Sequence, residues 1–191
     1  MADNKTEQPA DSGSGPFLER TYCVDIARPR LSARELMREV QCHLADFSPD
    51  LLAEFEKTTG AHDCLQMDDE FSIKILGPWN GNVRVTDVTE DSFEFVTLQG
   101  HPEAGLIRFS ARQDPQRPGV VRFEIHSWAR SRDGLVAFFY DKVGAGKRVQ
   151  EQTWRLFCEK VAERSGGEML GSVSIETMKD DGHHQTFSKD A

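Results

Sequence analysis

Apolar and polar residues alternate most regularly between Phe93 and Arg130. From Val121 to Arg130, every second side chain is apolar or small, and the intervening ones are mostly charged or polar. Successive side chains of a strand point to opposite faces, so this pattern predicts a half-buried antiparallel strand. Ile107–Arg112 and Phe93–Thr97 alternate in the same way, which predicts a meander of three strands. The predicted inward row of the last strand is Val121, Phe123, Ile125, Ser127 and Ala129.

That inward row becomes smaller along the strand, because Ser127 and Ala129 follow Phe123 and Ile125. Small residues on an inner face leave room for either a bulky helix or a cavity. Ser127 is therefore a candidate ligand-binding residue.

The part before the meander predicts one strand and two short helices. Phe17–Ile26 is a mixed apolar segment that predicts a first strand, at an edge or closing position. Ser32 followed by Glu35 forms a capping-box pattern, and apolar residues continue at helical spacing as far as Phe47. A second short helix is predicted from Leu51 to Gly60.

Two further strands and a long helix complete the predicted elements. Phe71–Leu76 and Asn82–Val88 alternate as strands, and 173–175 adds a short one after the helix. Leu135–Arg164 contains no proline and has apolar residues at helical intervals. Gln150 lies beside the apolar stripe of this helix, so it is either a helix flank or a polar group in a cavity.

The connection between the first two strands of the meander carries the strongest candidate chemistry. Gly100 and Pro102 constrain the backbone on both sides of His101, and Glu103 follows. A carboxylate near an imidazole favours the charged imidazole, and such a pair can move protons. A turn in which His101 bonds to the backbone is the interpretation we favour. No catalytic residue is assigned.

The composition indicates a single domain and argues against two kinds of partner. The 191 residues are enough for one domain, which we place at 16–178, with a disordered arm at 1–15 and a disordered tail at 179–191. The net charge is −9, and the basic residues are scattered among acids. This composition argues against nucleic acid and against anionic membranes as partners, because both bind clustered Lys and Arg.

The four cysteines lie far apart, without a Cys-x-x-Cys pair. The first residues lack the apolar segment of a signal peptide, so we expect a cytoplasmic protein with four free thiols. Neither the cysteines nor the histidines show the ligand spacing of a zinc site, and we expect no metal and no cofactor.

Two motifs carry a resemblance to a known family. They are Thr-Leu-x-Gly-His-Pro-Glu at 97–103 and Phe-x-Ile-x-Ser-x-Ala-Arg-Ser at 123–131. Together they resemble the signature of the family of the domain of unknown function numbered nineteen-ninety, whose members resemble START-like helix-grip proteins (polyketide cyclases and pollen allergens). The likeness is clear over 71–167 and weaker before it.

The resemblance implies an α+β fold, with a curved antiparallel sheet of about seven strands around the long C-terminal helix. It also implies a cavity for apolar ligands between sheet and helix. We therefore expect a monomer or weak homodimer, without membrane insertion, that binds a small hydrophobic molecule through His101, Glu103, Ser127 and Gln150. The alternatives are a cyclase- or hydrolase-type enzyme that uses His101 and Glu103 at the cavity mouth, and a non-catalytic interaction domain with a filled interior. We expect a binding protein rather than an enzyme.

Overall fold

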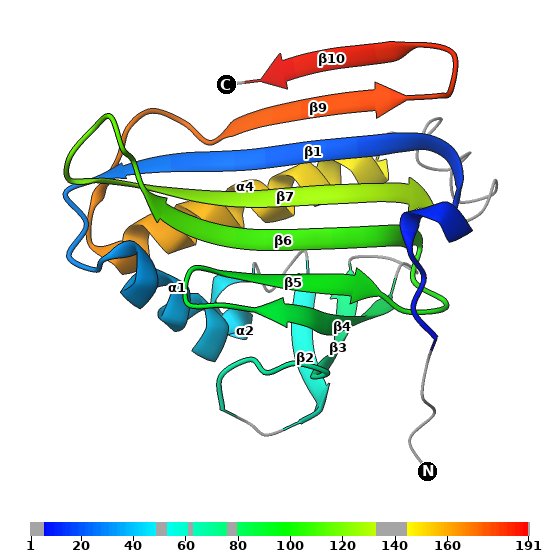
Figure 1. The fold of residues 1–191 in the computed structure, drawn as a ribbon, viewed down its shortest axis with the longest axis horizontal. Coiled ribbons are helices and arrows are strands. Elements are labelled where there is room, and N and C mark those ends of the chain that lie inside the picture. Colours follow the sequence, from blue (N-terminus) through cyan, green and yellow to red (C-terminus); the bar gives the residue numbers. More distant parts are fainter. Residues whose placement is uncertain (1–5, 49–52, 61–62, 76–79, 133–144, 191) are drawn as a thin grey trace.

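The computed structural model describes residues 6–48, 53–60, 63–75, 80–132 and 145–190. This part of the chain forms one ten-stranded antiparallel sheet, in the order β10-β9-β1-β7-β6-β5-β4-β3-β2 with the short β8 paired to β1 (Figure 1). The strands are β1 (Ser14–Ala27), β2 (Ala53–Thr59), β3 (Glu70–Ile75), β4 (Gly81–Val88), β5 (Ser92–Thr97), β6 (Glu103–Gln113), β7 (Val120–Ser131), β8 (Glu168–Met169), β9 (Ser174–Asp180) and β10 (Gln185–Asp190).

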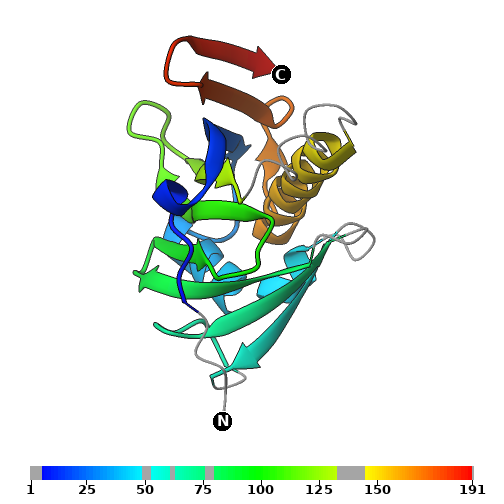
Figure 2. The ribbon, with the colours of Figure 1, turned by 90° about the vertical axis from the view of Figure 1, so that its right-hand side faces the viewer.

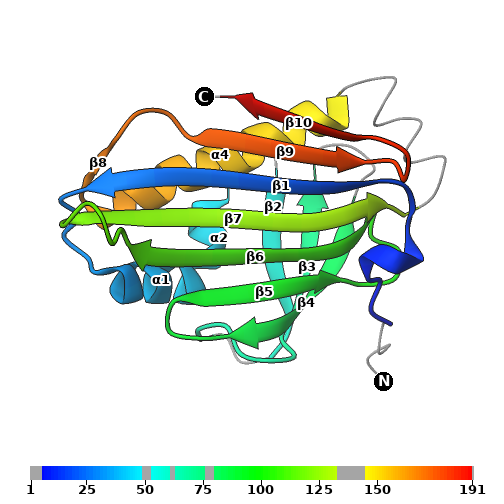
Figure 3. The ribbon, with the colours of Figure 1, turned by 45° about the horizontal axis from the view of Figure 1, so that its top comes forward.

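The sheet curves around its helices. Figure 2 shows β2 to β4 curling away from the plane of the other strands, and Figure 3 shows α4 (Ala145–Ser165) behind β1 and β7. The short helices α1 (Ala33–Cys42) and α2 (Leu44–Phe47) lie behind the same face of the sheet as α4. Within the described residues, no helix combines the length and apolarity needed to cross a bilayer.

The α+β class and the curved antiparallel sheet against a C-terminal helix are confirmed, whereas the predicted count of about seven strands is too low. The first half of the predicted long helix, up to Gly144, lies outside the described residues. β1 was expected at an edge or closing position, and it lies between β7 and β9, because β9 and β10 extend the sheet beyond it.

One predicted helix is a strand. The segment that we expected to be helical from Leu51 to Gly60 forms β2 over Ala53–Thr59 and pairs with β3, with Phe55 opposite Ile73. Phe55 is buried while its neighbour Glu56 is exposed, and this alternation suits a sheet. Two short helices do follow β1, because the helix capped by Ser32 and Glu35 is interrupted at His43.

Both ends of the chain are more ordered than we expected. Gln8 is buried, and its side-chain amide donates to the carbonyl oxygens of His101 at 3.0 Å and Glu103 at 2.8 Å. At the other end β9 extends to Asp180, and β10 pairs with it along its whole length as an exposed edge strand. The structure therefore differs from the predicted disordered arm and tail at these residues.

The expectation of four free cysteines is wrong. Cys42, at the end of α1, forms a disulfide with Cys64, and only Cys23 and Cys158 are free. The backbone N–H of Leu65 donates to the carbonyl oxygen of Gln41 at 2.9 Å, which keeps this loop beside the helix end. The contact is tertiary, and no spacing in the sequence reveals it.

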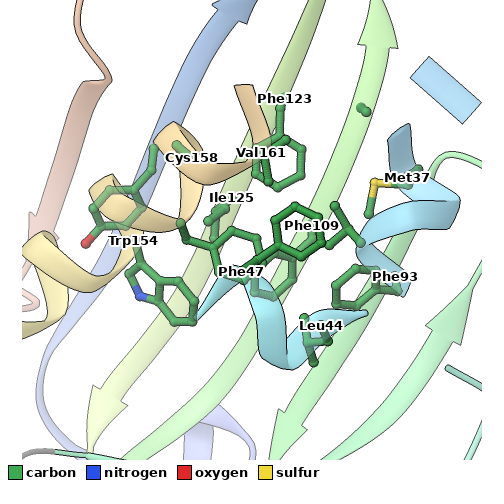
Figure 4. Packing of buried hydrophobic residues seen from close by; sticks show 14 of the residues in the cluster. Met37, Leu44, Phe47, Phe93, Phe109, Phe123, Ile125, Trp154, Cys158 and Val161 are labelled. Carbon is green, nitrogen blue, oxygen red and sulfur yellow. The ribbon is translucent and has the colours of Figure 1, made fainter. Parts of the chain in front are cut away.

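The centre of the space between the sheet and α4 is filled with aromatic side chains (Figure 4). Phe109 from β6 stacks on Phe93 from β5, with ring centroids 4.6 Å apart, and lies 5.4 Å from Phe157 of α4. Phe123 of β7 stacks on the same Phe157 at 6.1 Å. Aromatic side chains of three strands and of α4 therefore occupy the middle of this space.

Candidate functional site

The inner face of the sheet becomes polar where β1 and β6 begin and β7 ends. Arg20 of β1 pairs with Ser127 of β7, and Ser127 pairs on its other side with Ile107 of β6. Arg20 and Ser127 are both buried, at 4% and 7% exposed. The small inward residue that the sequence singled out thus lies beside a buried guanidinium.

The helix contributes an amide that joins two charged side chains. Nη1 of Arg20 donates to Oε1 of Gln150, and Nε2 of Gln150 donates to Oε2 of Glu103 at 2.9 Å. Glu103 is the first residue of β6, and Gln150 belongs to the first turns of α4. The structure therefore brings together Glu103, Gln150 and Ser127, three of the four residues expected to bind a ligand, and adds Arg20.

The helix α4 runs alongside β1 from this polar end to the far end of the strand. Gln150 meets Arg20 at the polar end, and at the other end the backbone N–H of Arg30, just after β1, donates to the carbonyl oxygen of Ser165 at 2.8 Å. Trp154 lies about 6 Å beyond Gln150 along the helix. Tyr22 lies about 6.6 Å beyond Arg20 along the strand. Trp154 and Tyr22 are therefore at similar distances from the contact between Gln150 and Arg20.

Three donors at this end of the molecule find no acceptor in the part of the chain that the structure describes. Nε of Arg20, the hydroxyl of Tyr22 and Nε1 of Trp154 are buried and lack a hydrogen-bond partner among the described residues. Tyr22 is fully buried and Trp154 is 9% exposed. Buried donors are nearly always paired in native structures, so a group of unpaired ones is the arrangement expected of a site that receives an acceptor from outside the chain.

Burial also shifts the protonation of this cluster. It raises the pKa of Glu103, against the opposing effects of Arg20 and of the hydrogen bond from Gln150. It raises the pKa of Tyr22 as well, although the nearby Arg20 acts in the opposite direction. Both shifts favour the uncharged forms, because a buried site solvates charge poorly.

His101 does not join this cluster. Its Nδ1 lies 3.0 Å from both the backbone nitrogen and the carbonyl oxygen of Glu103, so either tautomer has a backbone partner. Its ring lies against Gly81, where an added Cβ would come within 2.0 Å of Cδ2. This arrangement matches the turn interpretation.

The electrostatic expectation for His101 is wrong. We expected Glu103 to raise the pKa of the imidazole. Burial instead lowers this pKa to about 4, outweighing the raising effect of the hydrogen bond with the Glu103 backbone, and Arg132 acts in the same direction as burial. The carboxyl group of Glu103 bonds to Gln150 instead.

Sequence reasoning missed Arg20, Tyr22 and Trp154 as site residues. The signal in β1 was an arginine within an inward row that otherwise consists of Leu18, Tyr22, Val24 and Ile26. Trp154 was assigned to the apolar stripe of the helix, and its unpaired indole nitrogen can be recognised only once the side chains around it are known.

Comparisons with known proteins agree with this fold. A family model described as Domain of unknown function (DUF1990) matches residues 16–159. None of the curated proteins compared with the chain matches it.

Several solved structures share the fold at low identity. Norcoclaurine synthase from Thalictrum flavum superposes with a TM-score of 0.56 at 7% identity, covering 86% of this chain and 95% of that one. The same enzyme in complex with dopamine and hydroxybenzaldehyde gives 0.50 at 8% identity, over 77% and 87% of the two chains. A conserved protein from Geobacillus kaustophilus gives 0.51 at 12% identity, over 79% and 98%. At these identities the likeness establishes a START-like fold.

Proposed function

The chain belongs to the family described as Domain of unknown function (DUF1990), and from that premise we propose that it binds a small, largely apolar molecule. The binding site lies between the inner face of the sheet and the N-terminal half of α4, at the polar end formed by Arg20, Glu103 and Gln150. The observation that carries the proposal is the group of three buried donors without acceptors. His101 holds the turn before β6 and serves the site only indirectly.

The surroundings of the cluster suit an apolar body. Trp154 lies 6.4 Å from Phe55 and 5.6 Å from Phe109 between ring centroids, so aromatic faces continue from the polar end into the core. Ligand sites in proteins usually combine such apolar walls with a few converging polar groups. The structural relative with dopamine and hydroxybenzaldehyde holds small aromatic molecules in a protein of the same fold, which supports the proposal.

Native mass spectrometry of the full-length protein as purified tests this proposal. We expect a fraction of the protein to carry one small molecule, which is released under denaturing conditions. The matched control is Arg112→Met on the outer face of β6, where Arg112 makes an exposed ion pair with Glu124. This control should retain the molecule, whereas Arg20→Met should lose it. Protein without any bound molecule, which also fails to bind added apolar probes, would instead favour the interaction domain with a filled interior.

A second candidate function is a cyclase- or hydrolase-type enzyme in which Glu103 transfers a proton. It is favoured by the buried carboxyl group whose pKa is raised, since general acids in enzymes are tuned in this way. In this proposal the proton is assigned to Glu103 and not to His101, because burial lowers the pKa of His101 to about 4 and its Nδ1 bonds to the backbone of Glu103. Release of a chemically altered molecule by wild type, and of the unaltered one by Glu103→Gln, would distinguish the enzyme from a binding protein.

A further inference from the structure

Arg20 places a permanent positive charge beneath the sheet. The residue is 4% exposed, and its guanidinium donates to the neutral amide of Gln150 and lies close to the neutral hydroxyl of Tyr22. Within the described residues its guanidinium forms no ion pair with a carboxylate, although its charge acts on that of Glu103. Buried arginines are normally paired with an anion, because a buried charge without a partner strongly destabilises a fold.

Glu103 is not that partner. The amide of Gln150 stands between the two side chains, accepting from Arg20 and donating to Glu103 at 2.9 Å. Burial raises the pKa of Glu103, so its charged form is less favourable here than in water.

The free donors are of the kinds that recognise an oxyanion. The Nε edge of a guanidinium can bind a carboxylate through two parallel hydrogen bonds, and Nε is the atom of Arg20 that has no partner. The hydroxyl of Tyr22 follows two residues after Arg20 in β1, and the indole N–H of Trp154 follows four residues after Gln150 in α4. Both are also donors without a partner among the described residues. All of these residues are at least nine-tenths buried, so an oxyanion held by them would be shielded from water.

From this geometry we infer that the molecule bound at this site is an amphipathic acid, whose carboxylate pairs with Arg20 and whose apolar body lies against Trp154. The inference rests on the proposed function and narrows it to one chemical class. The carboxylate supplies the missing counterion and acceptors, and the aromatic side chains Phe55 and Phe109 continue the wall beyond Trp154.

Two acids of different shape, each compared with its neutral primary amide, test the inference. The first pair is dodecanoate and dodecanamide, and the second is naphthalene-2-carboxylate and naphthalene-2-carboxamide. Each probe is titrated by calorimetry at pH 7 into the full-length protein from which bound molecules have been extracted. We expect at least one acid to bind roughly tenfold or more tightly than its amide, since hydrogen bonds to charged groups are the stronger ones. In Arg20→Met this preference should fall to about twofold or less, whereas Arg112→Met should keep it.

The outcomes separate this inference from the proposed function. If the amides bind as tightly as the acids, or if the preference survives in Arg20→Met, the inference is wrong and the binding function stands. If no probe binds, the molecule released from the purified protein decides: an acid supports the inference, and a neutral molecule overturns it. If no probe binds and no molecule is released, both fail. Because Arg20→Met could bind poorly through misfolding, its near-ultraviolet circular dichroism must match that of wild type.

Discussion

Replacing Arg20 with Met separates a binding role from a structural one. A structural arginine stabilises the fold through its partners, whereas an arginine kept for a ligand destabilises the empty protein. Arg20 is 4% exposed, and its partners within the described residues are neutral groups such as the amide of Gln150, so it resembles the second kind. Met retains most of the apolar stem and removes the charge.

The size of the effect follows from two opposing contributions. The hydrogen bond from Arg20 to Gln150 stabilises the fold by about 1.5–3 kcal/mol, as is typical of bonds to charged groups. Burial of a charge without a counterion destabilises it by several kcal/mol after relaxation. We therefore expect the ligand-free variant to have a free energy of unfolding that is equal to that of wild type or higher by up to about 2 kcal/mol.

Urea denaturation of both proteins after extraction of bound molecules measures this difference, provided that the m-value is unchanged. The double variant Arg20→Met/Gln150→Met is the control, because it also removes the amide oxygen that the single variant leaves unpaired. A loss of more than about 2 kcal/mol in both variants would show that Arg20 is a structural residue. Wild type saturated with ligand should gain about 3 kcal/mol at a hundredfold excess over Kd, and the variants should not.

Three other predictions concern the fold around the site. The pKa of His101 is lowered from 6.5 to about 4, so the neutral ring contributes stability above pH 6.5 that is lost as the pH falls towards 4. This amounts to about 3 kcal/mol, and this pH dependence should be absent from the free energy of unfolding of His101→Asn, measured by urea denaturation at several pH values. Phe123→Ala should lower the free energy of unfolding by about 3–5 kcal/mol because Phe123 is fully buried, whereas Phe187→Ala, at a position 68% exposed, should stay within about 0.5 kcal/mol. Reduction of Cys42–Cys64, which are 22 residues apart, should remove about 3 kcal/mol in thermal unfolding, and a Cys42→Ser/Cys64→Ser variant should not respond to reductant.

Local patterns predicted the elements whose cause is local. The capping box of Ser32 and Glu35 starts α1, with the Ser32 N–H donating to the Glu35 carboxylate at 2.8 Å. The alternation of β7 placed Phe123, Ile125 and Ser127 on the inner face, where all three are buried. In contrast, β2 was predicted as a helix because Leu51, Leu52 and Phe55 also fit helical spacing, and only pairing with β3 decides between the two.

The site was predictable where one strand or loop carries the information and unpredictable where two elements meet. Ser127 and Glu103 could be chosen from their own segments, and the turn around His101 could be read from Gly100 and Pro102. The role of Gln150 stayed open because it depends on Arg20, which is 130 residues away in the sequence. The disulfide between Cys42 and Cys64 depends on a tertiary contact in the same way.

The indole N–H of Trp154 reports most directly on the claim that a small molecule fills this site. Its signal in ¹H–¹⁵N correlation spectra can be assigned with Trp154→Phe, and the indole of Trp128, which stacks on His126 at 3.9 Å on the outer face of the sheet, is the internal reference. Spectra of the protein as purified, after extraction, and after addition of dodecanoate should show the Trp154 signal shifting while that of Trp128 stays in place. A Trp154 signal that is the same in all three samples would contradict the account.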